Sequence, residues 1–372
     1  MKFTTTTGEL QRVLTKISGV VPTKSTMPIL ENFLFELLNN VLTITATDLE
    51  LSQTISLEVK GKEDGRIAVP SKRLLDTIRS FGPMDDATFD IDTTSNKINV
   101  KIAKGEFNLA GENAKEFPAL PSFQGKNELT LDAALLKKII QRTVFAVSTD
   151  ELRPAMMGVL FQPKEKELRA VSTDGHRLVR FTHVLPKGSE LQHEIIIPAK
   201  ALNIVGKAVE GGTVKLSMNE THVQFDFDKT VLISRLIDET YPNYESVIPT
   251  ENTKALTVNR EQMATAIRRV ALYASATTHQ VKLSLKKNSL TVSAQDIDFG
   301  GEAKERVDAE YDSDDLEIGF NSTYLVDILT HLDSEQVTFK FSTPTRAGIV
   351  SPTGNNNEEN VLMLVMPVRL NA

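Results

Sequence analysis

The chain has 372 residues, which is too long for one compact core and favours two or three domains. It contains no cysteine, and this excludes disulfides, a thiol nucleophile and thiolate metal sites. The formal net charge of −7, taken alone, argues against a nucleic-acid partner.

The predicted elements follow one order three times along the chain. Each copy opens with an amphipathic helix, in which apolar residues recur at helical spacing, and these helices are predicted over 8–20, 132–144 and 259–271. Two strands with alternating apolar residues follow around a polar turn. They end in a segment that contains an acidic residue: TATDLEL at 45–51, VSTDGHRL at 171–178 and SAQDIDF at 293–299.

Each copy continues with a short strand, a turn and a second helix, predicted over 71–80, 199–209 and 322–332. Further alternating strands lead to a proline-containing end: FPALP at 117–121, YPNYESVIP at 241–249 and MPVRL at 366–370. The acidic residues Asp48, Asp174 and Asp296 are 126 and 122 residues apart. This regular spacing predicts three tandem domains over 1–125, 126–250 and 251–372.

The predicted fold class is α+β. Half a copy has one amphipathic helix and a few strands, which is too little to bury a core alone. Two halves packed together give two helices on antiparallel sheets. Tandem copies can then pair their exposed sheet edges, and the array closes into a ring if the rotation per copy is a simple fraction of a turn.

Positive charge is concentrated on the predicted helices. Five of the six have a net positive charge, and only the helix over 322–332, with Asp327, is negative. Cations on exposed helix faces can be there simply to solvate the surface. Combined with the threefold repeat, however, they favour a positive lumen that contacts the phosphates of a polyanion without reading its sequence.

Four segments carry a family resemblance. They are PTKSTMPILENFLFE at 22–36, VSTDGHRL at 171–178, YPNYESVIP at 241–249 and VMPVRL at 365–370. Together with the triplication, they resemble the bacterial DNA polymerase III beta subunits, the sliding clamps, from Met1 to Leu370. The resemblance implies a head-to-tail homodimer whose six domains form a ring around double-stranded DNA. It also implies that the ring tethers the replicative polymerase and has no catalytic activity of its own.

The resemblance implies a peptide-binding pocket between the second and third domains. Its expected partners are the DNA polymerase III alpha subunit, clamp-loader subunits, and other DNA polymerases and repair proteins, all through short linear motifs. Ser246 stands where some members have arginine, and Asn371 and Ala372 extend past the usual last leucine. The residues expected in the pocket are Met156, Thr173, Gly175, His176, Arg177, Leu178, Pro242, Val247, Leu364, Val365, Met366, Pro367, Val368, Arg369 and Leu370.

DNA contacts are expected from one loop and from the helices. Lys24 lies at a loop position similar to one that contacts duplex DNA in this family. The further candidates are helix cations: Arg12, Lys16, Arg73, Lys138, Arg142, Lys200 and Lys207.

Two alternatives remain beside the ring. One is a repeat scaffold that never closes and binds partner peptides. The other is an α+β hydrolase in which Asp174 orients His176 as a general base, because alternate residues of a strand share one face. Against it, the remaining histidines lack metal-site spacing and no phosphate-binding loop is present. We expect no catalytic residue, cofactor or metal. The start of the chain has no apolar run and no segment is long enough to span a bilayer, so we expect a cytoplasmic protein without a membrane partner.

Overall fold

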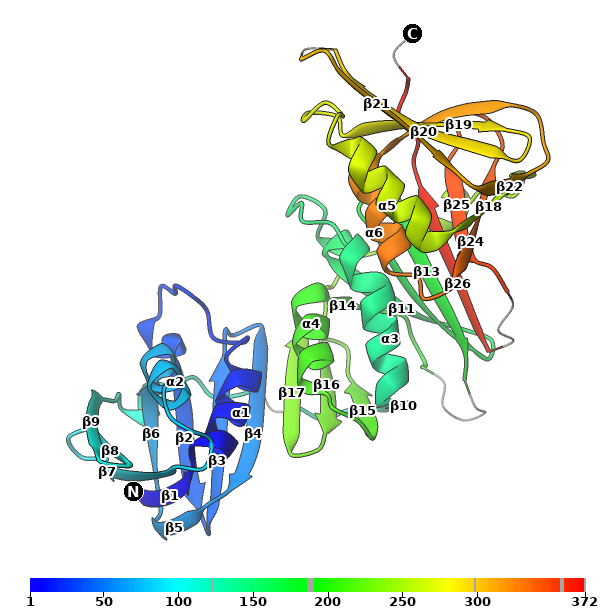
Figure 1. The fold of residues 1–372 in the computed structure, drawn as a ribbon. Coiled ribbons are helices and arrows are strands. Elements are labelled where there is room, and N and C mark those ends of the chain that lie inside the picture. Colours follow the sequence, from blue (N-terminus) through cyan, green and yellow to red (C-terminus); the bar gives the residue numbers. More distant parts are fainter. Residues whose placement is uncertain (122, 186–190, 298, 355–357, 371–372) are drawn as a thin grey trace. The chain divides into compact units, whose positions relative to one another are not determined.

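The structure is a computed structural model that describes residues 1–121, 123–185, 191–297, 299–354 and 358–370. The chain divides into two compact units (Figure 1). The first unit contains Met1–Lys137 and Lys200–Leu236, and the second contains Lys138–Ala199 and Ile237–Ala372. No helix in the described ranges is long and apolar enough to cross a membrane.

The first unit contains two antiparallel sheets and the helices α1 (Thr7–Ile17) and α2 (Ser71–Arg79). The five-stranded sheet has the order β5 (Lys60–Glu63), β1 (Lys2–Thr6), β7 (Asp86–Asp92), β8 (Lys97–Ile102) and β9 (Gly105–Ala110). The eight-stranded sheet has the order β10 (Asn127–Asp132), β15 (Thr213–Met218), β16 (His222–Phe227), β17 (Thr230–Arg235), β4 (Leu51–Glu58), β3 (Val41–Thr47), β2 (Asn32–Leu38) and β6 (Gly65–Pro70).

The second unit is built in the same way, with α5 (Arg260–Ala271) and α6 (Ser322–Thr330). Its nine-stranded sheet has the order β14 (Ile195–Pro198), β11 (Gly158–Lys164), β12 (Glu167–Thr173), β13 (Arg177–Val184), β26 (Glu359–Val365), β25 (Gly348–Pro352), β24 (Gln336–Phe341), β18 (Lys254–Asn259) and β22 (Ala309–Tyr311). Its four-stranded sheet has the order β21 (Gly301–Val307), β20 (Ser289–Asp296), β19 (Gln280–Lys286) and β23 (Leu316–Asn321).

The predicted helices are confirmed to within a few residues. The remaining two are α3 (Ala133–Thr143) and α4 (Ala199–Ala208). Helix α1 begins where the Thr6 side chain accepts a hydrogen bond from the Glu9 backbone N–H, and it buries Leu10 and Leu14. Helices on antiparallel sheets confirm the predicted α+β class.

The long sheets are continuous across the predicted copies. Strand β4 of the first copy pairs with β17 of the second, and β13 of the second pairs with β26 of the third. Sheet edges of neighbouring copies therefore pair, as predicted from the need to cover exposed edges. The second of these junctions carries the candidate site.

Candidate functional site

The segment STDGHR forms a tight turn between β12 and β13. The Thr173 hydroxyl donates to the Arg177 carbonyl oxygen over 2.7 Å and accepts from the Gly175 N–H. Asp174 Oδ1 accepts from the backbone N–H groups of His176 and Arg177, each at 2.9 Å. Gly175 has a φ of 89°, in the left-handed region where a side chain would be strained.

The same turn occurs between β3 and β4 of the first unit. The Thr47 hydroxyl donates to the Leu51 carbonyl oxygen over 3.0 Å, and Asp48 Oδ1 accepts from the N–H groups of Glu50 and Leu51. Leu49 takes the place of the glycine, with a φ of 81°. The first two copies therefore share the threonine and the aspartate of this turn, and the glycine, histidine and arginine are the local specialisation of the second copy.

The acid–base pair of the hydrolase alternative does not form. Both Asp174 oxygens are occupied, Oδ1 by two backbone N–H groups and Oδ2 by Arg177 Nε at 3.1 Å. The exposed His176 ring instead stacks on Tyr324 with ring centroids 5.7 Å apart. Because a general base needs a partner that fixes its tautomer, this arrangement does not favour catalysis at His176.

Arg177 connects the turn to α6. Its side chain is buried, with 9% of the residue exposed, and it lies over the rings of Phe145 and Tyr324 at 5.2 and 4.9 Å. The guanidinium donates to Asp174, to Asp327 Oδ2 at 2.5 Å and to the Phe145 carbonyl oxygen at 2.8 Å. All three nitrogens thus have acceptors, so Arg177 holds the site together and offers no free cation to a ligand.

A cavity of about 610 Å³ opens beside this turn. Its floor is apolar, since Leu178 and Leu364 belong to one buried cluster with Tyr241, Tyr244 and Ala347. Met366, which is 41% exposed, stands at the rim, and its backbone N–H donates to the His176 carbonyl oxygen over 2.8 Å. An apolar floor with a mixed rim suits a short peptide or another small, largely apolar ligand.

The segment after β17 lies against β11 and β12 of the nine-stranded sheet and forms one side of the cavity. The Tyr241 hydroxyl donates to the Val171 carbonyl oxygen, and burial raises the pKa of Tyr241. The Tyr244 hydroxyl donates to Gln162 Oε1 over 2.7 Å. Glu245 binds Lys164 and Arg169 at 2.9 and 2.7 Å, and the hydrogen bond from Lys164 lowers the pKa of Glu245. These contacts fix the segment before any ligand binds.

Ten of the fifteen predicted pocket residues line this cavity: Met156, Thr173, Gly175, His176, Arg177, Leu178, Pro242, Val247, Leu364 and Met366. Sequence reasoning missed the linker after Val247 and the loop between β24 and β25. These contribute Ile248, Pro249, Thr250, Glu251, Thr345, Arg346 and Ala347, and Asn243 and Tyr244 were missed as well. Ser246, which the resemblance already pointed to, also lines the cavity. The linker continues the YPNYESVIP motif, which was a usable signal, whereas the loop STPTRAG carries none.

The other five predicted residues do not line this cavity, and their part in a binding pocket stays a prediction: Val365, Pro367, Val368, Arg369 and Leu370. Val365 follows Leu364 in β26, so its side chain points to the opposite face and is fully buried in the main core. Beyond β26, the Val368 N–H donates to the Gly319 carbonyl oxygen of β23. The chain therefore leaves the cavity after Met366. Asn371 and Ala372 lie outside the described residues.

The predicted DNA-contacting cations differ in availability. The predicted DNA contact of Arg142 is not supported by the structure, because this side chain is buried and donates to Asp333 and to the His331 carbonyl oxygen. Four more have carboxylate partners: Arg12 and Lys16 share Glu210, Lys138 pairs with Glu359, and Lys200 pairs with Asp48. Lys24, Arg73 and Lys207 are exposed and have no ion pair within the described ranges.

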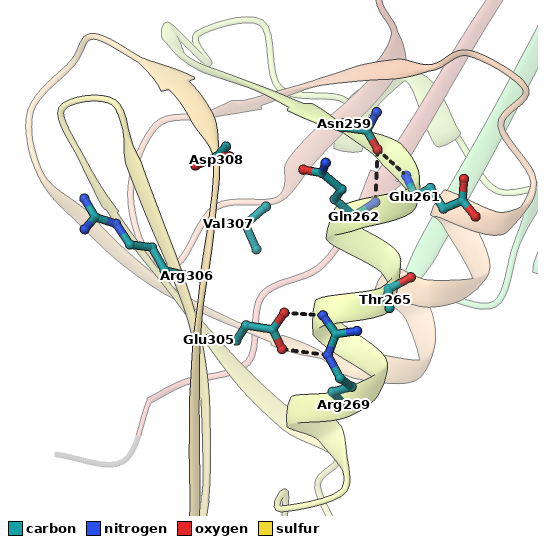
Figure 2. A pocket seen from close by; sticks show the side chains of 9 residues that line it. All are labelled: Asn259, Glu261, Gln262, Thr265, Arg269, Glu305, Arg306, Val307 and Asp308. Atoms are coloured by element: carbon teal, nitrogen blue, oxygen red, sulfur yellow. Dashed lines mark hydrogen bonds and ion pairs between the residues drawn. The ribbon is translucent and has the colours of Figure 1, made fainter.

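A second hollow, between α5 and β21, is polar (Figure 2). Arg269 donates twice to the Glu305 carboxylate, and Asn259 accepts from the N–H groups of Glu261 and Gln262 at the start of α5. Its main polar groups thus bind one another, and we assign it no ligand. No group of histidine and acidic side chains in the described part of the chain could hold a metal ion.

Three family models match the chain. They are the N-terminal domain of the DNA polymerase III beta subunit over 1–121, the central domain over 130–243 and the C-terminal domain over 245–369. Among curated relatives, the beta sliding clamp of Pseudomonas putida is 30% identical over 373 residues and covers both chains completely. That of Chlamydia pneumoniae is 32% identical and covers 100% of this chain and 99% of its own.

Solved structures show the same similarity. A DnaN sliding clamp from Bartonella birtlesii bound to griselimycin has a TM-score of 0.94 and 31% identity, and the match covers all of both chains. The corresponding clamp from Pseudomonas aeruginosa bound to griselimycin has a TM-score of 0.92 and 29% identity, again over all of both chains.

Proposed function

This chain belongs to the DNA polymerase III beta subunit family, the beta sliding clamps, and from that membership we propose that it is a processivity factor rather than an enzyme. Two copies associate head to tail into a ring around double-stranded DNA. The ring then tethers the replicative polymerase and repair proteins. This role places the protein in the cytoplasm, at replicating DNA.

The observation that carries the proposal is the cavity beside the Thr173–Arg177 turn. It has a buried apolar floor, a partly exposed methionine at its rim and walls fixed by hydrogen bonds. A short linear motif of the alpha subunit, a clamp-loader subunit or a repair protein would place its apolar side chains on this floor. Methionine suits such a site because its flexible thioether packs against differently shaped partners.

Three clamp domains over 1–125, 126–250 and 251–372 are part of the proposal. The recurrence of the threonine–aspartate turn supports a boundary between the first two copies. The ranges over which the three family models match are compatible with all three domains.

The decisive test of the ring uses DNA topology. Protein placed on a closed DNA circle by a clamp-loader ATPase should stay bound after loader and free protein are removed. Cutting the circle with a restriction enzyme should then release it, because a ring that encircles DNA leaves only over a free end. Equal release from circular and linear DNA would exclude encirclement.

Met366→Ala should weaken peptide binding. Truncating a side chain at the rim of an apolar pocket removes contact area, and we expect a loss of about five- to thirtyfold in affinity. The measurement is fluorescence anisotropy with a labelled peptide of the Gln-Leu type found in polymerase motifs. Met84→Ala is the matched control, because Met84 is also exposed but lies in the first unit. Unchanged affinity in Met366→Ala would contradict the assignment of the pocket.

For DNA, we propose that Lys24, Arg73 and Lys207 supply phosphate contacts, because they are exposed and have no ion pair with any described residue. Replacing all three with alanine should reduce the slope of log K against log salt concentration by about 2 to 3, since each neutralised phosphate contributes about 0.9. Titrations over a range of salt concentrations measure this slope. The control replaces three exposed strand lysines, Lys62, Lys286 and Lys340, and an equal reduction there would exclude a specific role for the first set.

Dimer contacts are proposed at two sheet edges. Strand β5 (KGKE) is a short, charged edge of the five-stranded sheet, so β9 (GEFNLA) is the edge better suited to pairing. In the four-stranded sheet, β23 is bonded to Val368, which leaves β21. Three exposed apolar side chains lie nearby: Leu272 at the end of α5, and Ile297 and Phe299 in the connection between β20 and β21. We therefore expect β9 of one copy to meet β21 of the other.

A further inference from the structure

We propose that Met366 is a modification site, at which oxidation of the thioether by hydrogen peroxide reversibly weakens peptide binding. This regulation rests on the proposed peptide-binding function and acts at the same cavity. Two features of the chain point to it. The sequence has no cysteine, and one of its few exposed methionines stands at the rim of the cavity.

Thioethers are the only sulfur groups of this chain. It has nine methionines and no thiol that would react with peroxide first, and all nine methionines lie in the described residues. Since oxidation follows exposure, the buried and partly buried ones are protected. These are Met1, Met156, Met157, Met218, Met263 and Met363. The three exposed methionines are Met27, Met84 and Met366, at 42%, 86% and 41%.

Met366 is the exposed methionine that lines the cavity, whereas Met27 and Met84 belong to the first unit. Its backbone is fixed on both sides of the peptide bond. The Met366 N–H donates to the His176 carbonyl oxygen over 2.8 Å, and the preceding Val365 is fully buried in the main core. The thioether is therefore held at the rim, where both a peptide and a reagent from solvent reach it.

The reaction transfers one oxygen atom to sulfur. A sulfur lone pair attacks one peroxide oxygen, an S–O bond forms and the O–O bond breaks. The proton on the transferred oxygen moves to the departing hydroxide, which leaves as water. Sulfur is thereby oxidised by two electrons and peroxide is reduced by two. Methionine sulfoxide reductases reverse the step at the expense of a dithiol, which becomes a disulfide while the oxygen leaves as water.

A sulfoxide at this position opposes peptide binding because its oxygen is a strong hydrogen-bond acceptor. In the free protein, water hydrates that oxygen, but an apolar peptide side chain on the cavity floor would displace the water. Nearby donors are already in use. The hydroxyls of Thr173 and Ser246 donate to the carbonyl oxygens of Arg177 and Asn243, and the Arg177 guanidinium has three acceptors. A polar group that loses water without gaining a partner lowers the affinity.

The experiment measures peptide affinity before and after oxidation of the full-length protein. Wild type is treated with hydrogen peroxide, the peroxide is removed, and binding of a labelled Gln-Leu-type peptide is measured by fluorescence anisotropy. We expect a loss of about five- to fiftyfold, with mass spectrometry showing the sulfoxide at Met366. Reductases for both sulfoxide epimers, supplied with a dithiol, should restore the affinity. Met366→Leu, compared with its own untreated sample, should lose nothing.

Three controls separate this site from general damage. Met27→Leu combined with Met84→Leu removes the other exposed methionines and should leave the loss unchanged. The urea midpoint of tyrosine fluorescence, which reports on the second unit, should not move. Bound peptide should slow oxidation of Met366 but not of Met84. Unchanged affinity when Met366 is fully oxidised, or an equal loss in Met366→Leu, overturns the inference. If untreated wild type binds no peptide, the proposed function itself fails.

Discussion

Arg177→Ala is expected to lower the free energy of unfolding of the second unit by about 3–5 kcal/mol, because it removes one member of a buried charge network. The substitution leaves Asp174 and Asp327 without their cation and the Phe145 carbonyl oxygen without its donor. It also removes the guanidinium that lies over the Phe145 and Tyr324 rings. Since Arg177 lines the pocket and holds its turn against α6, peptide binding should be lost as well.

The chain provides its own probe for this measurement. It has no tryptophan and five tyrosines, and all five lie in the second unit, at 241, 244, 273, 311 and 324. Tyrosine fluorescence during urea unfolding therefore reports on that unit alone. With a slope of about 2–3 kcal/mol per molar urea, the midpoint should fall by about 1–2 M.

One further variant tests the geometry of the network, and another is a control. Arg177→Lys should also destabilise, because an ammonium group cannot reach three acceptors in the geometry of a guanidinium. Arg235→Ala, in the first unit, should leave the tyrosine transition unchanged. A midpoint for Arg177→Ala equal to that of wild type would show that the network contributes nothing to stability.

The repeat and the helices could be predicted because they depend on local patterns, and apolar spacing fixes where α1 to α6 form. The turn at Asp48 and Asp174 is also closed by hydrogen bonds within four residues, but strand alternation instead predicts Asp174 and His176 on one face of a strand. Which cations are buried, and which acceptors they bind, could not be predicted. Arg142 and Arg177 find their acceptors at Asp333 and Asp327, 191 and 150 residues away. A count of helix charges cannot distinguish such a buried cation from an exposed one.

The two sheet junctions explain why α6 is the negative helix. At the first junction, Asp48 of the turn pairs with Lys200 of α4. At the second, Arg177 of the turn pairs with Asp327 of α6. Arg177 stands where the first copy has Leu51, so the second copy adds a cation to the turn, and Asp327 of α6 is its partner. The sequence shows α6 as an exception among cationic helices, and only the fold shows that its aspartate supports the pocket.

Leu272→Asp combined with Phe299→Asp is expected to convert a dimer into a monomer. These side chains are 81% and 90% exposed and lie near β21, whose partner in the described chain is β20 on one side and whose outer edge has no strand partner there. Burying a leucine or phenylalanine stabilises by about 1.5–3 kcal/mol, and an aspartate there would instead need costly desolvation. Because a closed head-to-tail dimer contains the interface twice, the loss also applies twice. In sedimentation, wild type should have twice the 41.1 kDa of one chain and the variant should have 41.1 kDa.

Three controls separate loss of association from loss of folding. Leu152→Asp alters an equally exposed leucine of the second unit and should leave the dimer intact. The double variant should keep the tyrosine unfolding midpoint and the affinity for peptide, because the pocket lies within one chain, but it should no longer be retained on closed circular DNA. A double variant that still sediments as a dimer would show that the β21 edge is not the closing surface. A wild type that sediments at 41.1 kDa would favour the open repeat scaffold over the ring.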